Sequence, residues 1–568
     1  MVGIGLVLAL VGGGMASASG RSKLVPAPSD RSNVRAPSDR TAVPPRPDGL
    51  STALSRGKID RAEYALERAS SLFDLKGTRG RFGGVERPDP HDATLFLRDL
   101  VLHKDELSGA DRRRANRILA RPTDQGDDPQ GDGWGNFGFA SNCDPNLDAN
   151  ADLDVCIHYI TNPISPDAAT NTFAAQAMTE VGNVWAEEID NLGYKQPQKD
   201  GNSQNSDSPD GALDIYLADI GDDGLYGYCT TDEPGAASKQ RVSAYCVLDN
   251  DYDPAQYNAP PPEVSGTDAL QVTLAHEIFH AIQFNYDWRE ALFLMEGTAV
   301  WMEDEVYDSI NASYAFLLDS ILHQPEVPLD GFQGDDDENF EYGAFVFFTY
   351  MSEAHQIMGR SGKDIVRFTW NEAEKPGKKG IAAIAAALKN HSKEAPCNNC
   401  GFPGKSTPYR DFFAQWGLFS AVYDLTYSEG FDGTCNGTGS YADILRCERP
   451  PFDGQYMLGP SRPSTGWRSL PMDRRSNRFV ELFPPGPIPA TELRVKINLP
   501  NKARGGEASF VMLSTGNVHR IKLNRKGNGS KKVDFAGTEA GSILTLSNTG
   551  PHNNETYKFK ATAEEINP

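Results

Sequence analysis

Two histidines and a glutamate stand close together in LAHEIFHAIQF, residues 274–284. His276 and His280 are four positions apart, so on a helix they share one face and can direct ring nitrogens at one ion. Neutral imidazole is a good zinc ligand. Glu277 is rotated by about 100° from His276, and its carboxylate can take a proton from water and pass it to a leaving amine. The spacing predicts a hydrolytic zinc site; the alternative is an apolar helix with two core histidines.

A catalytic zinc site needs a third protein ligand and an open fourth position. The class that takes its third ligand from H-E-x-x-H-x-x-G-x-x-H is excluded, because Gln283 and Tyr286 stand where Gly and His are required. The following segment MEGTAVWMED, residues 295–304, offers Glu296 on a second helix. Gly297 and Ala299 beside it are small, and we expect them to let this helix approach the first one closely. Glu296 is therefore the predicted third ligand.

Two further residues have open roles. Glu303 comes seven residues after Glu296 and lies on nearly the same helical face. It is either a rival third ligand or a residue that orients a ligating histidine, and the second role suits it better. Tyr342, in ENFEYGAF, can donate a hydrogen bond to an oxyanion or simply pack beside Gly343. The sequence does not decide between these roles.

The elements that must position these residues predict an α+β fold. Residues 266–425 are helical in character, and LDIYLADI, residues 213–220, alternates as a strand does. Both belong to an expected zincin-like catalytic domain over residues 124–480. After Pro485, apolar residues recur at every second position (Leu493, Val495, Ile497, Leu499). This pattern predicts a small β-sandwich over residues 485–568.

The N-terminal part divides into three predicted segments. Residues 1–18 carry an apolar run that ends in Ala16-Ser17-Ala18, which predicts a signal peptide cleaved before Ser19. A membrane anchor is the alternative, but no later stretch approaches 18 consecutive apolar residues. Residues 19–49 are rich in Pro, Ser, Asp and Arg and are expected to be a disordered linker. We therefore expect a secreted, extracellular protein.

Residues 50–123 are predicted to form a helical, positively charged region. KIDRAEYALERASSLF, residues 58–73, has apolar residues at helical spacing, and Asp60 is placed to cap the helix. LSGADRRRANRILARP, residues 107–122, is a second basic, helix-prone piece. Because the rest of the chain is acidic, this region could lie against the catalytic domain as the pro-region of a zymogen. A small helical domain that stays attached is the alternative.

The eight cysteines fall into close pairs, which favours disulfides formed outside the cytoplasm. Cys397 and Cys400 could instead form half of a zinc knuckle, but no second pair of ligands has the required spacing. The expected disulfides are Cys143–Cys156, Cys229–Cys246, Cys397–Cys400 and Cys435–Cys447.

One acidic run has two interpretations. Oxygen-bearing side chains occupy every second position from Asp144 to Asp154, and calcium prefers many oxygen ligands. However, Ala149 stands where an EF-hand loop needs glycine, and Val155 where it needs a bidentate glutamate. A solvated loop closed by a disulfide is favoured, and Ca²⁺ stays the alternative beside the expected Zn²⁺.

The central motifs resemble known families. MEGTAVW resembles the E-G-x-A-x-W element that follows H-E-x-x-H in zinc aminopeptidases of the aminopeptidase N type, a resemblance that implies a zinc-ligating role for Glu296. The chain departs from that family in spacing, because 15 residues, fewer than in the family, separate His280 from Glu296. HEIFHAIQF, MEGTAVWMED and EYGAFVFFTYM are more similar to a group of secreted bacterial metalloproteases, and LDIYLADIG upstream also looks like that group. This resemblance covers about residues 50–430 and implies a gluzincin-type metallopeptidase.

These observations predict a secreted, monomeric zinc endopeptidase that acts on proteins or peptides. The formal charge of −23 argues against a nucleic-acid partner, and no stable membrane anchor is expected. Two alternatives remain. A non-catalytic binding or cell-surface protein would hold a structural metal closed by a fourth protein ligand, for which the sequence offers no obvious candidate. An aminopeptidase would need an anchor for the substrate's free amine, but the G-x-M-E-N element of the aminopeptidase N type is absent.

Overall fold

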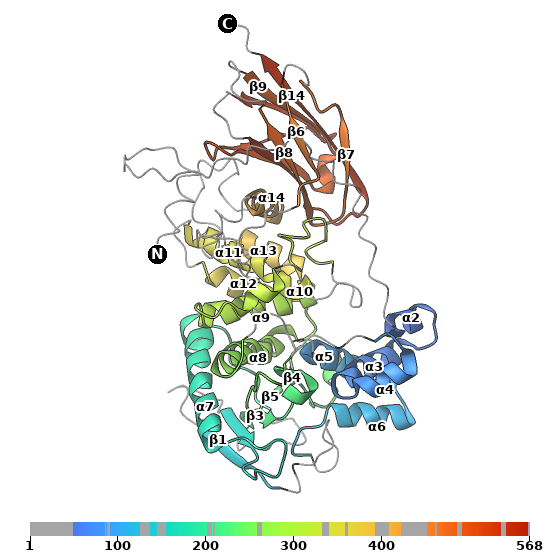
Figure 1. The fold of residues 1–568 in the computed structure, drawn as a ribbon, viewed down its shortest axis with the longest axis vertical. Helices are drawn as coiled ribbons and strands as arrows, with labels where there is room; N and C mark the ends of the chain where they lie inside the picture. Colours follow the sequence, from blue (N-terminus) through green and yellow to red (C-terminus); the bar gives the residue numbers. More distant parts are fainter. Residues whose placement is uncertain are drawn as a thin grey trace.

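The computed structural model describes most of the chain and shows a mixed α+β protein (Figure 1). The described residues are 49–85, 87, 91, 93–124, 134, 137–144, 155–200, 207, 211–257, 264–317, 319–331, 340–357, 362–391, 408–421, 451–459, 463–484, 491–535 and 541–565. The predicted signal peptide, nearly all of the predicted linker, the acidic run after Asp144 and the cysteine pairs of residues 397/400 and 435/447 lie outside these residues.

The N-terminal region is helical, as its sequence predicts. Its helices are α2 (Gly49–Ser55), α3 (Arg61–Phe73), α4 (Leu75–Phe82), α5 (Ala93–His103) and α6 (Gly109–Ile118). Asp60 caps α3 through its side chain, which accepts from the Glu63 N–H at 2.9 Å, while Glu63 accepts from the Asp60 N–H at 2.9 Å. This reciprocal pair satisfies two N–H groups that a helix start leaves unpaired. The predicted cap is confirmed.

A five-stranded sheet forms the centre of the next region. Its strands are β1 (Ala140–Asp144), β2 (Val155–Tyr159), β3 (Leu213–Ala218), β4 (Gly227–Thr230) and β5 (Tyr245–Asp249), in the order β1-β2-β3-β5-β4. β2, β3 and β5 run parallel, whereas β1 and β4 are antiparallel edge strands. The predicted strand over residues 213–220 is present, but it ends two residues earlier, at Ala218. Every residue of β2, β3 and β5 is buried, as expected for strands covered on both faces.

Two of the predicted disulfides join neighbouring strands of this sheet. Cys143–Cys156 links β1 to β2, and Cys229–Cys246 links β5 to the edge strand β4. In both cases the two cysteines are directly opposite one another in the strand register. Residues on opposed strands are close enough for a disulfide. The two cysteines of each pair are close in the sequence and also lie on paired strands, so the prediction from sequence proximity was correct.

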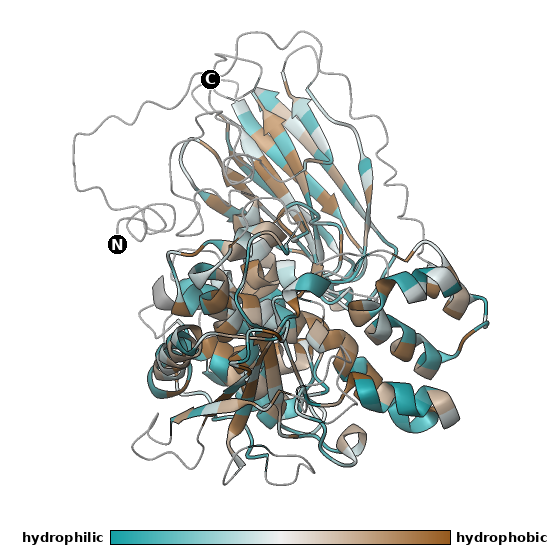
Figure 2. Cartoon of the chain, turned by 60° about the horizontal axis from the view of Figure 1, so that its bottom comes forward, coloured by the Kyte–Doolittle hydropathy of each residue, from teal (hydrophilic) through white to brown (hydrophobic). Residues whose placement is uncertain are grey.

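Helices pack against the sheet and continue into a helical layer. They are α7 (Asn171–Trp185) with the π-turn η3 (Ala186–Asn191), α8 (Thr267–Asp287), α9 (Leu292–Val306), η7 (Ala312–Phe316), α10 (Phe340–Gly343), α11 (Phe345–Ile357), α12 (Asp364–Ala373), α13 (Ile381–His391) and α14 (Tyr409–Ser420). One continuous apolar core joins these helices to the sheet and to α3, α5 and α6. Apolar residues gather inside this region and hydrophilic ones cover the outer helices (Figure 2).

The C-terminal region is a β-sandwich, as predicted, but it begins earlier. One sheet has the order β11-β10-β13-β8-β6 and the other β12-β9-β14-β7. The strands are β6 (Gly454–Met457), β7 (Arg468–Met472), β8 (Ser476–Phe483), β9 (Thr491–Asn498), β10 (Gly506–Met512), β11 (Val518–Arg520), β12 (Asn528–Asp534), β13 (Ser542–Asn548) and β14 (Glu555–Glu565). Since β6, β7 and β8 are paired within these sheets, the sandwich starts before residue 485. In the sequence, Pro485 and its neighbours interrupt the alternation of apolar and polar residues from which the later strands of the sandwich were predicted.

The sandwich packs on the end of the helical layer (Figure 1). Leu418 of α14 forms a small apolar cluster with Phe479, Val511 and Ile543 of the sandwich. Arg475 adds an ion pair with Asp330 across the same boundary. No helix among the described residues is long and apolar enough to cross a membrane.

Candidate metal centre

Helix α8 carries the H-E-x-x-H motif through the core of the molecule. Its residues His276, Glu277 and His280 are 2%, 3% and 0% exposed, so the motif is fully enclosed. Helix α9 packs against α8 and brings Glu296, which is 0% exposed, to the same place. The four predicted site residues therefore meet although they come from two helices.

The predicted reason for the close approach of α9 is wrong in one detail. We expected Gly297 to face α8. A Cβ atom at Gly297 would instead lie 3.0 Å from Ala344 Cβ and 2.9 Å from Phe348 Cε2. Those contacts belong to the segment that ends α10 and begins α11. The small residue therefore lets α9 approach the layer on its far side, and this packing holds Glu296 against α8 from behind.

The three predicted ligand atoms form a tight triangle. The Nε2 atoms of His276 and His280 are 3.0 Å apart, and Glu296 Oε2 lies 3.2 Å from the first and 3.3 Å from the second. Atoms bonded to one tetrahedral zinc at about 2.0–2.1 Å would lie about 3.3 Å from one another. His276, His280 and Glu296 are therefore a buried group that could hold a metal ion.

The outer nitrogens of both rings are held by side chains. His276 Nδ1 is 2.7 Å from Glu303 Oε1, and His280 Nδ1 is 2.8 Å from Gln283 Oε1. A carboxylate can only accept, so Nδ1 of His276 carries the proton. Gln283 Nε2 donates to Met295 O at 2.9 Å, which turns its oxygen toward His280. Both rings can thus keep an Nε2 lone pair for a metal.

This arrangement assigns Glu303 the orienting position that the sequence favoured for it. It also includes Gln283, which sequence reasoning treated only as the residue that rules out one peptidase class. A signal for Gln283 was present, because residues three positions apart on a helix are neighbours. The amide of Gln283 also bonds the hydroxyl of Thr298 at 3.2 Å, so it fixes α9 as well as the imidazole of His280.

The residues of the triangle fit a cation on two grounds. Glu296 Oε1 is buried and has no hydrogen-bond partner among the described residues, which is costly for a carboxylate unless a positive charge is near. Burial raises the pKa of Glu296, but His280 and His276 outweigh it and hold the pKa at about 2. Burial lowers the pKa of His276, but its contacts with Glu296 and Glu303 raise the pKa by more, so the pKa lies well above its ordinary value. Both shifts favour a positive charge beside Glu296, which without a bound metal is a proton on His276.

Glu277 lies beside the triangle with a different set of partners. Burial raises the pKa of Glu277, while His280, His276 and the Thr94 hydrogen bond oppose the rise. Its Oε2 accepts a hydrogen bond of 3.0 Å from the Thr94 hydroxyl. A cavity of about 10 Å³, lined by Glu277, His276, Glu303, His91, Tyr226, Gly227, Val272 and Thr273, adjoins it. That volume is about the space of one water molecule.

Thr94 and His91 were missed by sequence reasoning. Thr94 is 183 residues away from Glu277 along the chain, and no local spacing connects the two. His91 lies with its ring centroid 6.2 Å from that of His276. Both residues belong to the N-terminal region. The sequence allowed this region to be a pro-region, but it gave no reason to place any of its residues beside the candidate metal site.

Tyr342 lies near the triangle but its predicted role stays a prediction. Its ring is 6.4 Å from that of His276 at an interplanar angle of 29°, and 5.0 Å from that of Phe316. The residue is fully buried. Its ring therefore helps to enclose the site, and the packing role that the sequence allowed is present whatever its hydroxyl does.

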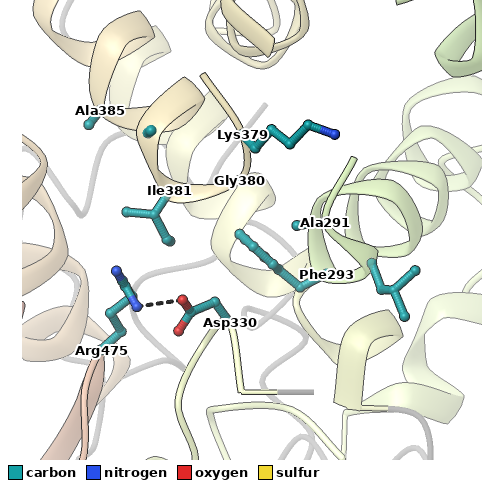
Figure 3. A pocket seen from close by; sticks show the side chains of 10 residues that line it. Ala291, Phe293, Asp330, Lys379, Gly380, Ile381, Ala385 and Arg475 are labelled. Atoms are coloured by element: carbon teal, nitrogen blue, oxygen red, sulfur yellow. Dashed lines mark hydrogen bonds and ion pairs between the residues drawn. The ribbon is translucent and has the colours of Figure 1, made fainter. Parts of the chain in front are cut away.

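A larger cavity lies elsewhere. It measures about 580 Å³ and lies between the start of α9, the start of α13 and the sandwich. Ile381 and Phe293 project toward it, with the Arg475–Asp330 ion pair at one side (Figure 3). None of its lining residues is a predicted site residue, so this cavity is separate from the candidate metal site.

Comparisons with known proteins leave the chain without an assigned family. No family model matches it, and no curated protein matches it. Among solved structures, a match described as a novel beta-glucosidase from Paenibacillus barengoltzii has 10% identity and a TM-score of 0.12. The alignment covers 74% of this chain and 54%, about half, of the glucosidase chain. A superposition this poor carries no argument about fold or function.

Proposed function

We propose that this protein is a secreted zinc endopeptidase. The observation that carries the proposal is the triangle of His276, His280 and Glu296, with Glu277 beside it. Two histidines and one carboxylate are the ligand set of a catalytic zinc site that keeps one position open. The described disulfides favour an oxidising compartment and so support secretion. The motif resemblance supports peptides as the substrate class.

The ligand count also favours catalysis over a structural metal. A closed structural site needs four protein ligands, and the described residues supply three whose atoms converge. Two further carboxylates adjoin the triangle: Glu303, which is engaged with His276 Nδ1, and Glu277, which is engaged with Thr94. The cavity beside Glu277 then lies where a water molecule can sit.

The reaction can be derived from what these side chains do. A bound zinc ion would act as a Lewis acid that polarises the scissile carbonyl and acidifies water. Glu277 takes the proton of the attacking water at a carboxylate oxygen and delivers it to the nitrogen of the leaving amine. Burial raises the pKa of Glu277, which makes it a better base. Glu303 and Gln283 keep the two imidazoles in the tautomer and orientation that ligation requires.

Three variants of the full chain, beside the wild type, test the proposal. We expect about one zinc ion per chain in wild type and in Glu277→Gln, and little or none in His280→Ala and Glu296→Ala, measured by elemental analysis after dialysis. Hydrolysis of an unfolded protein should fall at least a hundredfold in Glu277→Gln, because general-base catalysis contributes about 10²–10⁴-fold. Chelation should abolish wild-type hydrolysis, and added zinc should restore it.

Two results would contradict the proposal in different ways. A wild-type chain that binds no divalent metal would show that His276 and Glu296 form only an imidazolium–carboxylate pair. A Glu277→Gln variant that keeps its zinc and hydrolyses at the wild-type rate would show that the metal is present but Glu277 is not the base. Asp287→Asn on the same helix, outside the ligand triangle, serves as the matched control for loss of one carboxylate.

A further inference from the structure

Thr94 bonds two groups of the metal centre at once. Its hydroxyl donates to Glu277 Oε2 at 3.0 Å and accepts from the Cys229 N–H at 2.8 Å. The Thr94 residue is fully buried. This hydrogen bond occupies one of the two carboxylate oxygens that could otherwise accept the proton of water. Thr94 therefore engages the very group on which the proposed reaction depends.

The second partner of Thr94 belongs to the edge of the central sheet. β4 is the last strand in the order β1-β2-β3-β5-β4, and α5 packs against it. Edge strands present backbone N–H and C=O groups that can pair with an extended peptide. The Cys229 N–H is such a group, and it is taken by Thr94. An extended peptide that added to β4 would have to displace Thr94.

His91 occupies the space on the same side of the metal centre. Its ring centroid lies 5.3 Å from Tyr226, 5.1 Å from Phe316, 5.9 Å from Tyr342 and 6.2 Å from His276. These rings come from four separate parts of the fold and surround it. The cavity that His91 lines holds about one water molecule, so it has no room for a peptide.

Hydrogen bonds anchor the chain on both sides of these residues. Arg87 Nη1 donates to Asp223 O at 2.7 Å. Arg98, on the first turns of α5, donates from Nε to Trp288 O at 2.7 Å and from Nη2 to Glu290 O at 2.8 Å, where the turn between α8 and α9 lies. Leu97 and Leu100 of α5 are 0% exposed. His91 and Thr94 are thus held in place by contacts to the rest of the fold.

We propose that His91 and Thr94 inhibit the enzyme by occupying the place where a peptide substrate would lie between β4 and Glu277, an inference that rests on the proposed function. Thr94 takes the hydrogen bonds of the edge strand and of the base, and His91 fills the approach to the metal. The opposite assignment, in which Thr94 positions Glu277 in the working enzyme, predicts the opposite change in rate. One set of variants therefore decides between them.

The experiment uses the full chain with Thr94→Val or His91→Ala. Valine keeps the shape of threonine but offers neither hydrogen bond. We expect hydrolysis of an unfolded protein to rise at least tenfold in each variant at unchanged zinc content. Thr78→Val and His103→Ala are the matched controls. Thr78 is buried in the same region but bonds Asp74 O within its own helix, and His103 lies at the far end of α5 beside Glu106. Both should retain the wild-type rate.

A second readout does not need turnover. Acetohydroxamate is a small metal ligand, and its binding changes the visible spectrum of a cobalt-substituted site. We expect it to bind cobalt-substituted His91→Ala at least tenfold more tightly than the wild type, and to bind Thr94→Val, which keeps the shape of threonine, about as tightly as the wild type. A lower or unchanged rate together with unchanged hydroxamate affinity would overturn the inhibitory role. If hydroxamate binds more tightly to a variant but no variant hydrolyses protein, the peptidase proposal is wrong, whereas the contact of His91 with the approach to the metal is supported.

Discussion

Two buried groups of acidic side chains illustrate different solutions to the same electrostatic problem. Arg121, 1% exposed, contacts the carboxylates of Asp200 at 2.6 Å, Asp232 at 3.0 Å and Asp214. Asp214 also contacts His158 at 2.9 Å. We call these residues the arginine cluster. Its acids receive their positive charge from a guanidinium of the chain itself.

The candidate metal centre buries Glu296 against two imidazoles and no guanidinium. Among the described ion pairs, Glu296 contacts only His276 and His280, and its Oε1 has no described hydrogen-bond partner. An ionised carboxylate in the interior is costly unless it is paired with a positive charge. The comparison indicates that the arginine cluster is complete as a protein structure, whereas the other group could hold a metal ion. Four predictions test this difference.

The largest effect is expected from Arg121→Met, which leaves the acids of the arginine cluster without their cation. Removing one partner of a buried ion pair destabilises by about 3–5 kcal/mol. Urea unfolding should show this loss, while zinc content stays at the wild-type level. Arg61→Met is the control, because Arg61 is half exposed in its pair with Asp99 and surface pairs contribute about 1 kcal/mol or less. Loss of zinc in Arg121→Met would show that the clusters are not independent.

Metal removal should destabilise the other cluster by a similar amount. A ligand at about 1,000 times its dissociation constant stabilises the folded state by about 4 kcal/mol. We therefore expect a chelator to lower the thermal unfolding midpoint of the wild type by several degrees, as measured by calorimetry. The same chelator should leave the midpoint of Glu296→Ala unchanged. An equal drop in both proteins would place the responsible metal outside the His276–His280–Glu296 triangle.

Asp249 shows what a buried carboxylate does when backbone N–H groups are its main partners. Burial raises its pKa to about 6, although the Gly221 and Tyr252 N–H groups oppose the rise. The folded pKa lies above the ordinary value of 3.8, so the stability from the protonated form is complete below about pH 4 and is lost as pH rises through 6. A rise of roughly two pKa units corresponds to roughly 3 kcal/mol.

The measurement is urea unfolding of wild type and Asp249→Asn between pH 4 and pH 7 in chelator. Asparagine cannot ionise, so the stability of wild type relative to the variant should fall by about 2–3 kcal/mol over this range. Using the difference cancels the titration of all other carboxyls. A difference that stays constant with pH would mean that Asp249 ionises as readily in the folded chain as in the unfolded one.

The smallest effect is expected from the group that orients a ligand. Glu303→Gln can still accept a hydrogen bond from His276 Nδ1 but lacks the negative charge, and such partners contribute about 10–100-fold to metal affinity. Competition with a chromophoric chelator should show a loss in that range. Glu305→Gln is the control on the same helix, because Glu305 pairs with Lys363. A complete loss of binding would instead identify Glu303 as a ligand in its own right.

Much of the candidate site was accessible from the sequence because its ligands lie on two consecutive helices. Helical spacing put His276 and His280 on one face, and a seven-residue step put Glu303 near Glu296. Gln283 was equally accessible but was not used. The prediction that Gly297 faces α8 was wrong, because the sequence shows that a helix carries small residues on one face but does not show which neighbouring helix that face contacts.

The fold divides in the same way. The cap at Asp60, the strand from Leu213 and the strand-to-strand disulfides follow from local pattern and could be predicted. The start of the sandwich could not, because β6 to β8 (Gly454–Phe483) join sheets whose other strands lie beyond residue 490. Pairing between distant strands depends on the packed structure, and a break in alternation near Pro485 carries no information about it.

The sequence by itself placed His276 and His280 on one helical face, since helix periodicity fixes which side chains lie together within a few turns. Their meeting with Glu296 depends on how α9 packs against α8. Only the tertiary structure decided that the N-terminal region meets this site. Thr94 and Glu277 are 183 residues apart, and they touch because one continuous apolar core joins α5 to α8 and the sheet. The burial of that shared core, rather than any spacing along the chain, places a threonine hydroxyl against the proposed catalytic base.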